Sequence, residues 1–205
     1  MKDINATVIV NIEPSEEDIL KNLQKDARWG LNKAKNEGLT VREISSDEEW
    51  NNFYEVYKKT VIEGGINPDS LEELKKNTAV LFICEKEGKI IAGAGIFFTD
   101  MYDKEIPRLY INASLREYLN SQPNNLLYWN CLTWAKNKGY KKFDLGGWQI
   151  NAQGHLVGVN KFKERWGEVV YYKKDYPFPL AIGRKLIRNV KVARWTWDRI
   201  KGRPL

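Results

Sequence analysis

Two neighbouring segments in the C-terminal half constrain the fold and its site most. Residues 139–148 read Gly-Tyr-Lys-Lys-Phe-Asp-Leu-Gly-Gly-Trp, which predicts a short strand that runs into a double-glycine turn. Residues 158–167 read Gly-Val-Asn-Lys-Phe-Lys-Glu-Arg-Trp-Gly, which predicts an amphipathic helical stretch closed by a glycine. Because glycines carry no Cβ, the turn lets backbone come close to a ligand. Lys163, on the helix beside it, can direct a positive charge at developing negative charge.

The composition indicates one domain with a substantial core. The 205 residues are 42% hydrophobic and include eight Trp and ten Tyr. There is no run of about 18 apolar residues, and the N-terminus is too interrupted for a signal peptide. Cys84 and Cys131 lie in apolar patterns, so we expect reduced core cysteines in a cytoplasmic protein. A single histidine without a Cys/His cluster argues against a metal site.

The positive charge is concentrated in the last residues. The net charge is +6, and residues 180–205 carry eight Lys and Arg residues but one acid, so the remaining chain is nearly neutral. The pattern predicts a basic amphipathic helix over about 182–201, with its cations largely on one face. Such a helix suits RNA or an anionic lipid surface at the inner membrane face, or it packs on the domain. The cations assigned to this contact are Arg184, Arg188, Lys191, Arg194 and Arg199.

The periodicity predicts an α/β fold with a mixed sheet flanked by helices. Residues 1–179 form the predicted domain, with a strand and helix extension at 1–38 and a tail at 180–205. The expected strands are 6–12, 39–44, 79–84, 90–98, 108–114, 141–145 and 169–173. The expected helices begin at Ser15 (one helix to about residue 34) and Ser46 (to Gly64), and cover 68–76, 123–138 and 155–166.

One part of this order positions a site. The strand 108–114, the helix 123–138 and the strand 141–145 form a βαβ unit with parallel strands. Ligands of such sheets bind beyond the carboxyl ends of the strands. This rule places near the site Asn112, Ser114, Gly146, Gly147 and Trp148.

Several other side chains have a functional and a structural interpretation. Tyr110 and Tyr118 either bind substrate or make strand and core contacts. Asp144 is either a base for an attacking amine or an acceptor of backbone N–H groups at the turn. His155 is either an acid/base or the start of a helix. A set of cations on the first helix either contacts tRNA phosphates or forms a solvated face: Lys21, Lys25, Arg28, Lys33 and Lys35.

The motifs, taken in order, resemble the GNAT acyltransferase fold, and more closely the C-terminal half of FemABX-type aminoacyltransferases. They are Arg28-x-x-Leu-x-Lys-Ala-x-x-x-Gly38, Phe53-Tyr54 with Thr60, Tyr110-Ile-Asn-Ala-Ser114, Asn125-Leu-Leu-x-Trp129, Trp134-Ala-Lys-x-x-Gly139, Phe143-Asp-Leu-Gly-Gly147 and Phe162-Lys163 with Gly167. Two positions differ from the family pattern. No arginine follows Thr60, and Asn112 stands where glycine is frequent.

The resemblance implies transfer of an aminoacyl group from a charged tRNA to an amine of a peptide or lipid-linked acceptor of the cell wall. It implies that Lys163 stabilises charge in this reaction, and it adds Phe162 to the substrate-binding residues. Family members have two GNAT-like halves, and this chain has room for one. A homodimer is one way to replace the missing half.

Two alternatives stay open. One is a CoA-dependent N-acyltransferase, although residues 115–125 contain no glycine for the loop that cradles a pyrophosphate. For this reason we expect no bound cofactor. The other is a binding or partner module that has lost its chemistry.

Overall fold

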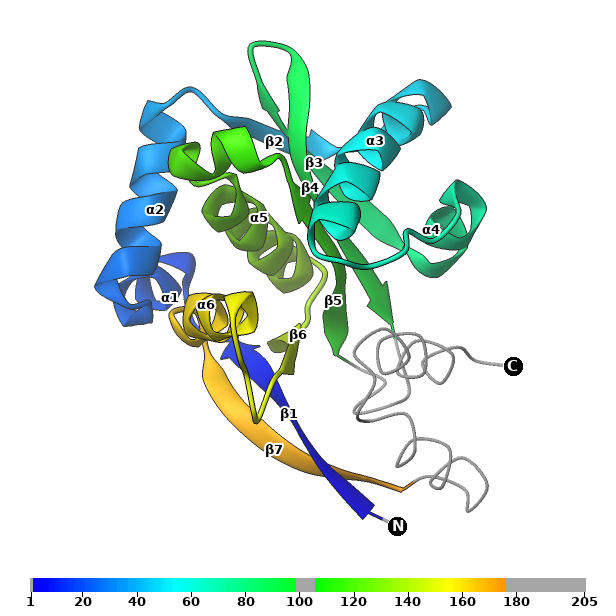
Figure 1. The fold of residues 1–205 in the computed structure, drawn as a ribbon. Coiled ribbons are helices and arrows are strands. Elements are labelled where there is room, and N and C mark those ends of the chain that lie inside the picture. The colour runs from blue at the N-terminus through cyan, green and yellow to red at the C-terminus, as the bar shows by residue number, and fades with distance from the viewer. Residues whose placement is uncertain (1, 99–105, 176–205) are drawn as a thin grey trace.

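The computed structural model describes residues 2–98 and 106–175, so the predicted tail helix lies outside the described residues. Within them, seven strands form one mixed sheet in the order β2-β3-β4-β5-β6-β1-β7 (Figure 1). The strands are β1 (Lys2–Asn11), β2 (Thr40–Glu43), β3 (Val80–Lys86), β4 (Lys89–Phe98), β5 (Pro107–Ser114), β6 (Lys142–Trp148) and β7 (Glu168–Asp175). The helices are α1 (Glu16–Asn22), α2 (Lys25–Asn36), α3 (Asp47–Glu63), α4 (Leu71–Asn77), the 3-10 helix η1 (Arg116–Ser121), α5 (Pro123–Asn137) and α6 (His155–Glu164).

Helices cover both faces of the sheet, which confirms the predicted α/β class. α5 lies against one face with α2 packed on it, and α3 lies against the other face with α4 beside it (Figure 1). β3 and β4 form a hairpin with Gly88 in its turn, and β5 and β6 form the predicted parallel pair around α5. Cys84 and Cys131 are buried free thiols, as expected, and burial raises the pKa of Cys84 to about 12.

The single N-terminal helix that we predicted is wrong, because α1 and α2 are separate. Leu23 and Gln24 are extended at the break. The Arg28 guanidinium donates to the carbonyls of Lys21, at 2.8 Å, and Leu23, while the Gln24 N–H donates to the Arg165 carbonyl at 3.1 Å. These bonds satisfy groups that a continuous helix would pair internally. The break therefore depends on tertiary contacts with the end of α6.

The strand predicted to end before a double-glycine turn does not end there. β6 continues through both glycines to Trp148 and pairs with β1 along this stretch. Thr7 lies opposite Gly147 and Ile9 lies opposite Asp144, so β6 holds one extra residue between these pairs. Leu145 and Gly146, opposite Val8, therefore form a β-bulge inside the strand, which bends β6 beside the site.

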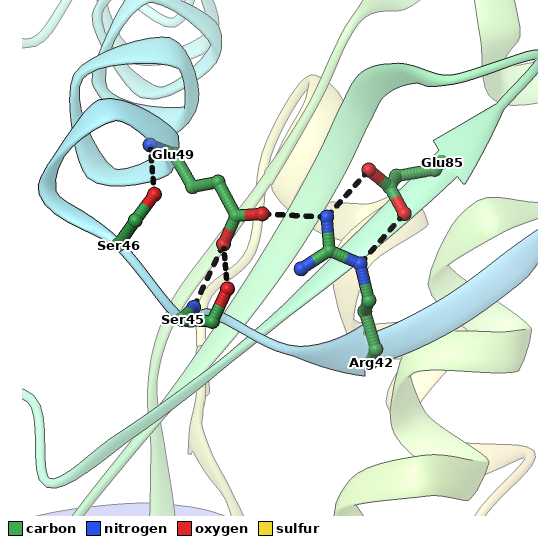
Figure 2. A network of polar contacts seen from close by, with 5 residues as sticks. All are labelled: Arg42, Ser45, Ser46, Glu49 and Glu85. Carbon is green, nitrogen blue, oxygen red and sulfur yellow. Dashed lines mark hydrogen bonds and ion pairs between the residues drawn. The ribbon is translucent and has the colours of Figure 1, made fainter.

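A polar network fixes the edge strand β2 to its neighbours (Figure 2). Arg42 of β2 bonds Glu85 of β3 through two nitrogens, at 2.9 and 3.0 Å, and pairs with Glu49 of α3 at 2.7 Å. Glu49 also accepts from the Ser45 N–H at 2.7 Å, while its own N–H donates to the Ser46 cap at 3.2 Å. The hydrogen bond from Arg42, followed by that from the Ser45 backbone, lowers the pKa of Glu49 to about 2.

This network predicts an acid-sensitive contribution to stability. The folded-state pKa of Glu49 lies below its ordinary value of 4.5, so its stabilising effect is complete above that pH and is lost as the pH falls toward about 2. Glu49→Gln should lower the thermal midpoint at pH 7, and the difference from the parent protein should shrink progressively below pH 4.5. Glu48→Gln, at an exposed position of the same turn, is the control. A difference that stays constant with pH would contradict the expected linkage.

Candidate functional site

Asp144 is a buried carboxylate that connects three strands. Its side chain accepts a hydrogen bond from the Thr7 hydroxyl of β1 and one from the Gly146 N–H at 2.7 Å. Arg108 of β5 lies opposite it in the parallel ladder, with Nη1 3.4 Å from Asp144 Oδ2. Asp144 is 1% exposed. Because a buried carboxylate needs such partners, the structural interpretation of Asp144 is confirmed.

The bulge at Gly146 creates the space for the lysine. Gly146 has φ +79°, which side chains with a Cβ rarely adopt. A Cβ there would lie 3.2 Å from the Leu109 carbonyl oxygen and 3.6 Å from Lys163 Nζ. The C-terminal part of β6 pairs with β1 on one side. On its other side, β6 runs parallel to β5, and Arg108 pairs with Asp144 within the described strands. Lys163 reaches β6 at Gly146 and Gly147.

Three consecutive contacts hold α6 against the end of β6. The buried Asn160 side chain accepts from the Gln149 N–H at 3.0 Å and donates to the Gln149 carbonyl at 2.8 Å. One turn later, Lys163 Nζ donates to the Gly147 carbonyl at 3.0 Å. Glu164 accepts from the Trp148 indole N–H at 2.6 Å. Sequence reasoning missed Asn160, whose signal was an amide one turn before Lys163 on the same face of the helix.

The environment of Lys163 changes its acidity. Burial of the ammonium is the largest cause, followed by repulsion from Arg108, and attraction to Asp144 opposes both. Together they lower the pKa of Lys163 to about 8 from an ordinary 10.5. A lysine that titrates near neutral pH can donate or accept a proton during a reaction.

Tyr128 of α5 also contacts residues of the site. The hydroxyl of Tyr128 lies 3.3 Å from Asn112 Nδ2, which donates to it from β5. Its ring contacts Phe162 of α6 edge-on, with centroids 5.1 Å apart, and lies 5.7 Å from the Trp166 ring. Burial raises the pKa of Tyr128, so its hydroxyl stays protonated. Tyr128 therefore links Asn112 to Phe162, a role that sequence reasoning missed.

Two predicted site residues have other contacts. The Ser114 hydroxyl donates to Asn124 Oδ1 at 2.6 Å, and its backbone bonds the Thr60 hydroxyl in both directions, each at 3.1 Å. Ser114 thus joins the end of β5 to α3 and α5. Tyr110 packs against Phe97, with ring centroids 5.2 Å apart, and lies against the apolar cluster under α3 and α4.

The remaining candidates lie elsewhere on the helices. His155 is the first residue of α6 and is exposed, as the helix-start interpretation expects. Tyr118 lies in η1 with Lys89 Nζ 5.3 Å from its ring centre. Of the cations proposed to contact tRNA, Arg28 bonds carbonyls at the α1–α2 break and Lys21 pairs with Glu17 at 2.9 Å.

The segment that would cradle a pyrophosphate does not fit that role. η1 occupies the connection between β5 and α5, and α5 begins with Pro123, which has no N–H. The Asn125 N–H donates to the Gln122 carbonyl at 3.1 Å. These amides offer little to a diphosphate. Among residues 2–98 and 106–175, no group of three or more His, Cys, Asp or Glu residues is arranged to hold a metal ion.

The sheet, with β5 and β6 parallel around α5, defines a GNAT-like fold. It is similar to the GCN5-related glucosamine N-acetyltransferase region of a fungal multi-domain β-N-acetylglucosaminidase, with a TM-score of 0.54 and 11% identity over 83% of this chain and 20% of the other. Residues 2–72 match the model of the FemAB family. The predicted resemblance to FemAB-type proteins is therefore confirmed. None of the curated proteins matches the sequence significantly.

Two further solved structures share the fold. FemX gives a TM-score of 0.69 at 16% identity, and the match covers 90% of this chain and 64% of FemX. The C-terminal domain of a putative lysylphosphatidylglycerol synthetase from Agrobacterium fabrum gives 0.64 at 14% identity, covering 91% of this chain and 66% of that domain. The chain thus spans slightly less than two thirds of each. No helix in the described part of the chain is both long and apolar enough to cross a bilayer.

Two glycines, Gly146 in the bulge and Gly158 in α6, should respond in opposite ways to substitution by alanine. Gly146→Ala places a Cβ in a left-handed conformation and against Leu109, so it should destabilise the fold by roughly 1–3 kcal/mol. Gly158→Ala, in α6 with no atom of the described residues within 4 Å of the new Cβ, should stabilise the fold by up to about 1 kcal/mol. Denaturant unfolding of both variants measures the two free energies. An unchanged Gly146→Ala protein would contradict the bulge geometry.

Proposed function

We propose that the protein is an aminoacyltransferase that moves an aminoacyl group from a charged tRNA to an amine of a peptide acceptor in envelope biosynthesis. The observation that carries the proposal is the Lys163 ammonium, held by the Gly147 carbonyl at the bulge and titrating near neutral pH. The FemAB match and the fold of FemX support this class of reaction.

Lys163 acts on the negative charge that develops as the acceptor amine attacks the ester carbonyl. Its ammonium sits where water is largely replaced by protein, so its interaction with an oxyanion or with the leaving ribose oxygen is stronger than in bulk water. Because α6 is fixed to β6 at Gln149, Gly147 and Trp148, the charge is positioned before the substrates bind.

The remaining site residues surround this charge. Gly146 and Gly147 let the ester approach the backbone, Trp148 and Phe162 supply apolar surface for the aminoacyl side chain, and Asn112 supplies an amide. Tyr110 and Ser114 act at the two faces of β5, as substrate contacts at the edge of the site. The protein acts in the cytoplasm, and its tail cations bring it to tRNA or to the membrane surface.

The acceptor and the donor have alternatives. A neighbouring structure is named a putative lysylphosphatidylglycerol synthetase, so a lipid-linked acceptor is the alternative to a peptide. The similarity to an N-acetyltransferase region makes acyl-CoA the alternative donor, against which the η1 segment and Pro123 argue.

Substitution of the lysine tests the catalytic assignment. Lys163→Met should lower transfer by roughly 100-fold or more, because it removes the positive charge from the developing anion. Its thermal midpoint should stay within a few degrees of the parent, since burying an ammonium is costly and a methionine fills the same space. Lys161→Met, exposed on the same helix, should retain activity. Full transfer by Lys163→Met would end the assignment.

The donor is tested by binding. We expect a total tRNA pool charged with radiolabelled amino acids to bind more tightly than the same pool after deacylation, at one fixed salt concentration. CoA should not compete. Equal binding of the two pools would point to a binding module, and displacement by CoA would point to acyl-CoA as the donor.

A further inference from the structure

Arg108 stands out among the charged residues around the site. Its side chain is 12% exposed, and Nη1 is buried 3.4 Å from the Asp144 carboxylate, without a hydrogen-bond partner among residues 2–98 and 106–175. A guanidinium stays charged at every accessible pH, so this position holds a permanent positive charge inside the protein. An arginine that served only to pair with Asp144 would be expected to form hydrogen bonds through the nitrogen that faces it.

The position of Arg108 connects it to Lys163. Gly146 is close to both groups: its N–H bonds Asp144, the ion-pair partner of Arg108, and a Cβ on it would lie 3.6 Å from Lys163 Nζ. The charged groups acting on the ammonium are Arg108 on β5 and Asp144 on β6. On α5, Tyr128 contacts Phe162 through its ring and keeps its hydroxyl protonated, and on α6, Glu164 accepts a hydrogen bond from the Trp148 indole.

We propose that Arg108 is a positioning residue that acts through Lys163, and that its fixed charge, held by Asp144, makes the Lys163 ammonium a proton donor to the leaving oxygen of the ester. This inference rests on the proposed function. Arg108 need not touch the substrate, because its effect reaches the reaction as repulsion of the neighbouring ammonium. Asp144 keeps that repulsion from expelling the proton altogether.

The proton balance of the transfer follows from this role. The acceptor nitrogen forms a bond to the ester carbonyl carbon, and the bond between that carbon and the ribose oxygen breaks. Lys163 gives a proton to the departing oxygen. The proton that the attacking nitrogen loses returns to Lys163, so the site needs no other acid or base and regains its starting state.

Two measurements on the full-length protein test the inference. The first is the titration of the Lys163 side chain, followed by NMR with 13C-labelled lysine and assigned by comparison with Lys163→Arg. The midpoint should lie near 8 in the parent. It should rise in Arg108→Gln, fall in Asp144→Asn, and stay close to the parent in Arg108→Lys, which keeps the charge.

The second measurement is the pH profile of transfer from charged tRNA. A proton donor is active below its pKa, so the parent should lose activity above about pH 8, and this limb should move to higher pH in Arg108→Gln. At pH 7 the same variant should lose roughly tenfold in kcat with little change in KM, because a weaker acid transfers its proton less readily. Arg108→Lys should restore both.

The outcomes separate the two proposals. A Lys163 midpoint that does not respond to Arg108→Gln, or a pH limb that fails to follow the midpoint, would overturn the role of Arg108. Activity that rises with pH through the midpoint would overturn it too, since the neutral amine would then be the active form. The Lys163 midpoint could respond as expected in a protein that transfers no aminoacyl group from any charged tRNA. This result would support the interaction between Arg108 and Lys163 and overturn the aminoacyl-transfer proposal. Matched unfolding curves establish that each variant is folded.

Discussion

The Asp144 carboxylate is the group on which the geometry of the site depends. It receives hydrogen bonds from β1 and from the bulge, and it holds the guanidinium of β5. Without an acceptor at this point, the Gly146 N–H would be buried and unpaired, at a cost of about 1–3 kcal/mol. The bulge places Gly147 so that its carbonyl faces α6, and only then does Lys163 find its partner. One structural carboxylate thus fixes the position of the proposed catalytic charge.

The Lys163 ammonium lies in surroundings that disfavour its positive charge. Such a position lowers the stability of the fold but is useful for catalysis. Burial and Arg108 both favour the neutral amine, and a folded protein gains nothing from that repulsion. An apolar side chain would fill the same volume at less cost. Side chains that lower the local stability of the fold are common at functional sites.

Much of the fold could be predicted from local signals, and the details of the site could not. The Ser15 and Ser46 caps, the Gly88 turn and the apolar face of α5 act within a few residues, so the sequence displays them directly. The double glycine was read as a turn because only pairing with β1 distinguishes a turn from a bulge. Arg108 and Tyr128 gain their roles from partners far along the chain. The family match over residues 2–72 also ends before every one of these site residues.

The position of Lys163 in α6 limits how far its pKa is lowered. It lies in the last turn, where the partial negative charge of the helix terminus favours a cation, and its ammonium donates a hydrogen bond to the Gly147 carbonyl. Asp144 adds attraction of the same sign. Burial and Arg108 act against all three, and the balance lies near neutral pH instead of far below it. A lysine buried without these partners would lose its charge and could not act as a donor. One buried with them but without Arg108 would hold its proton more tightly and would be a weaker acid.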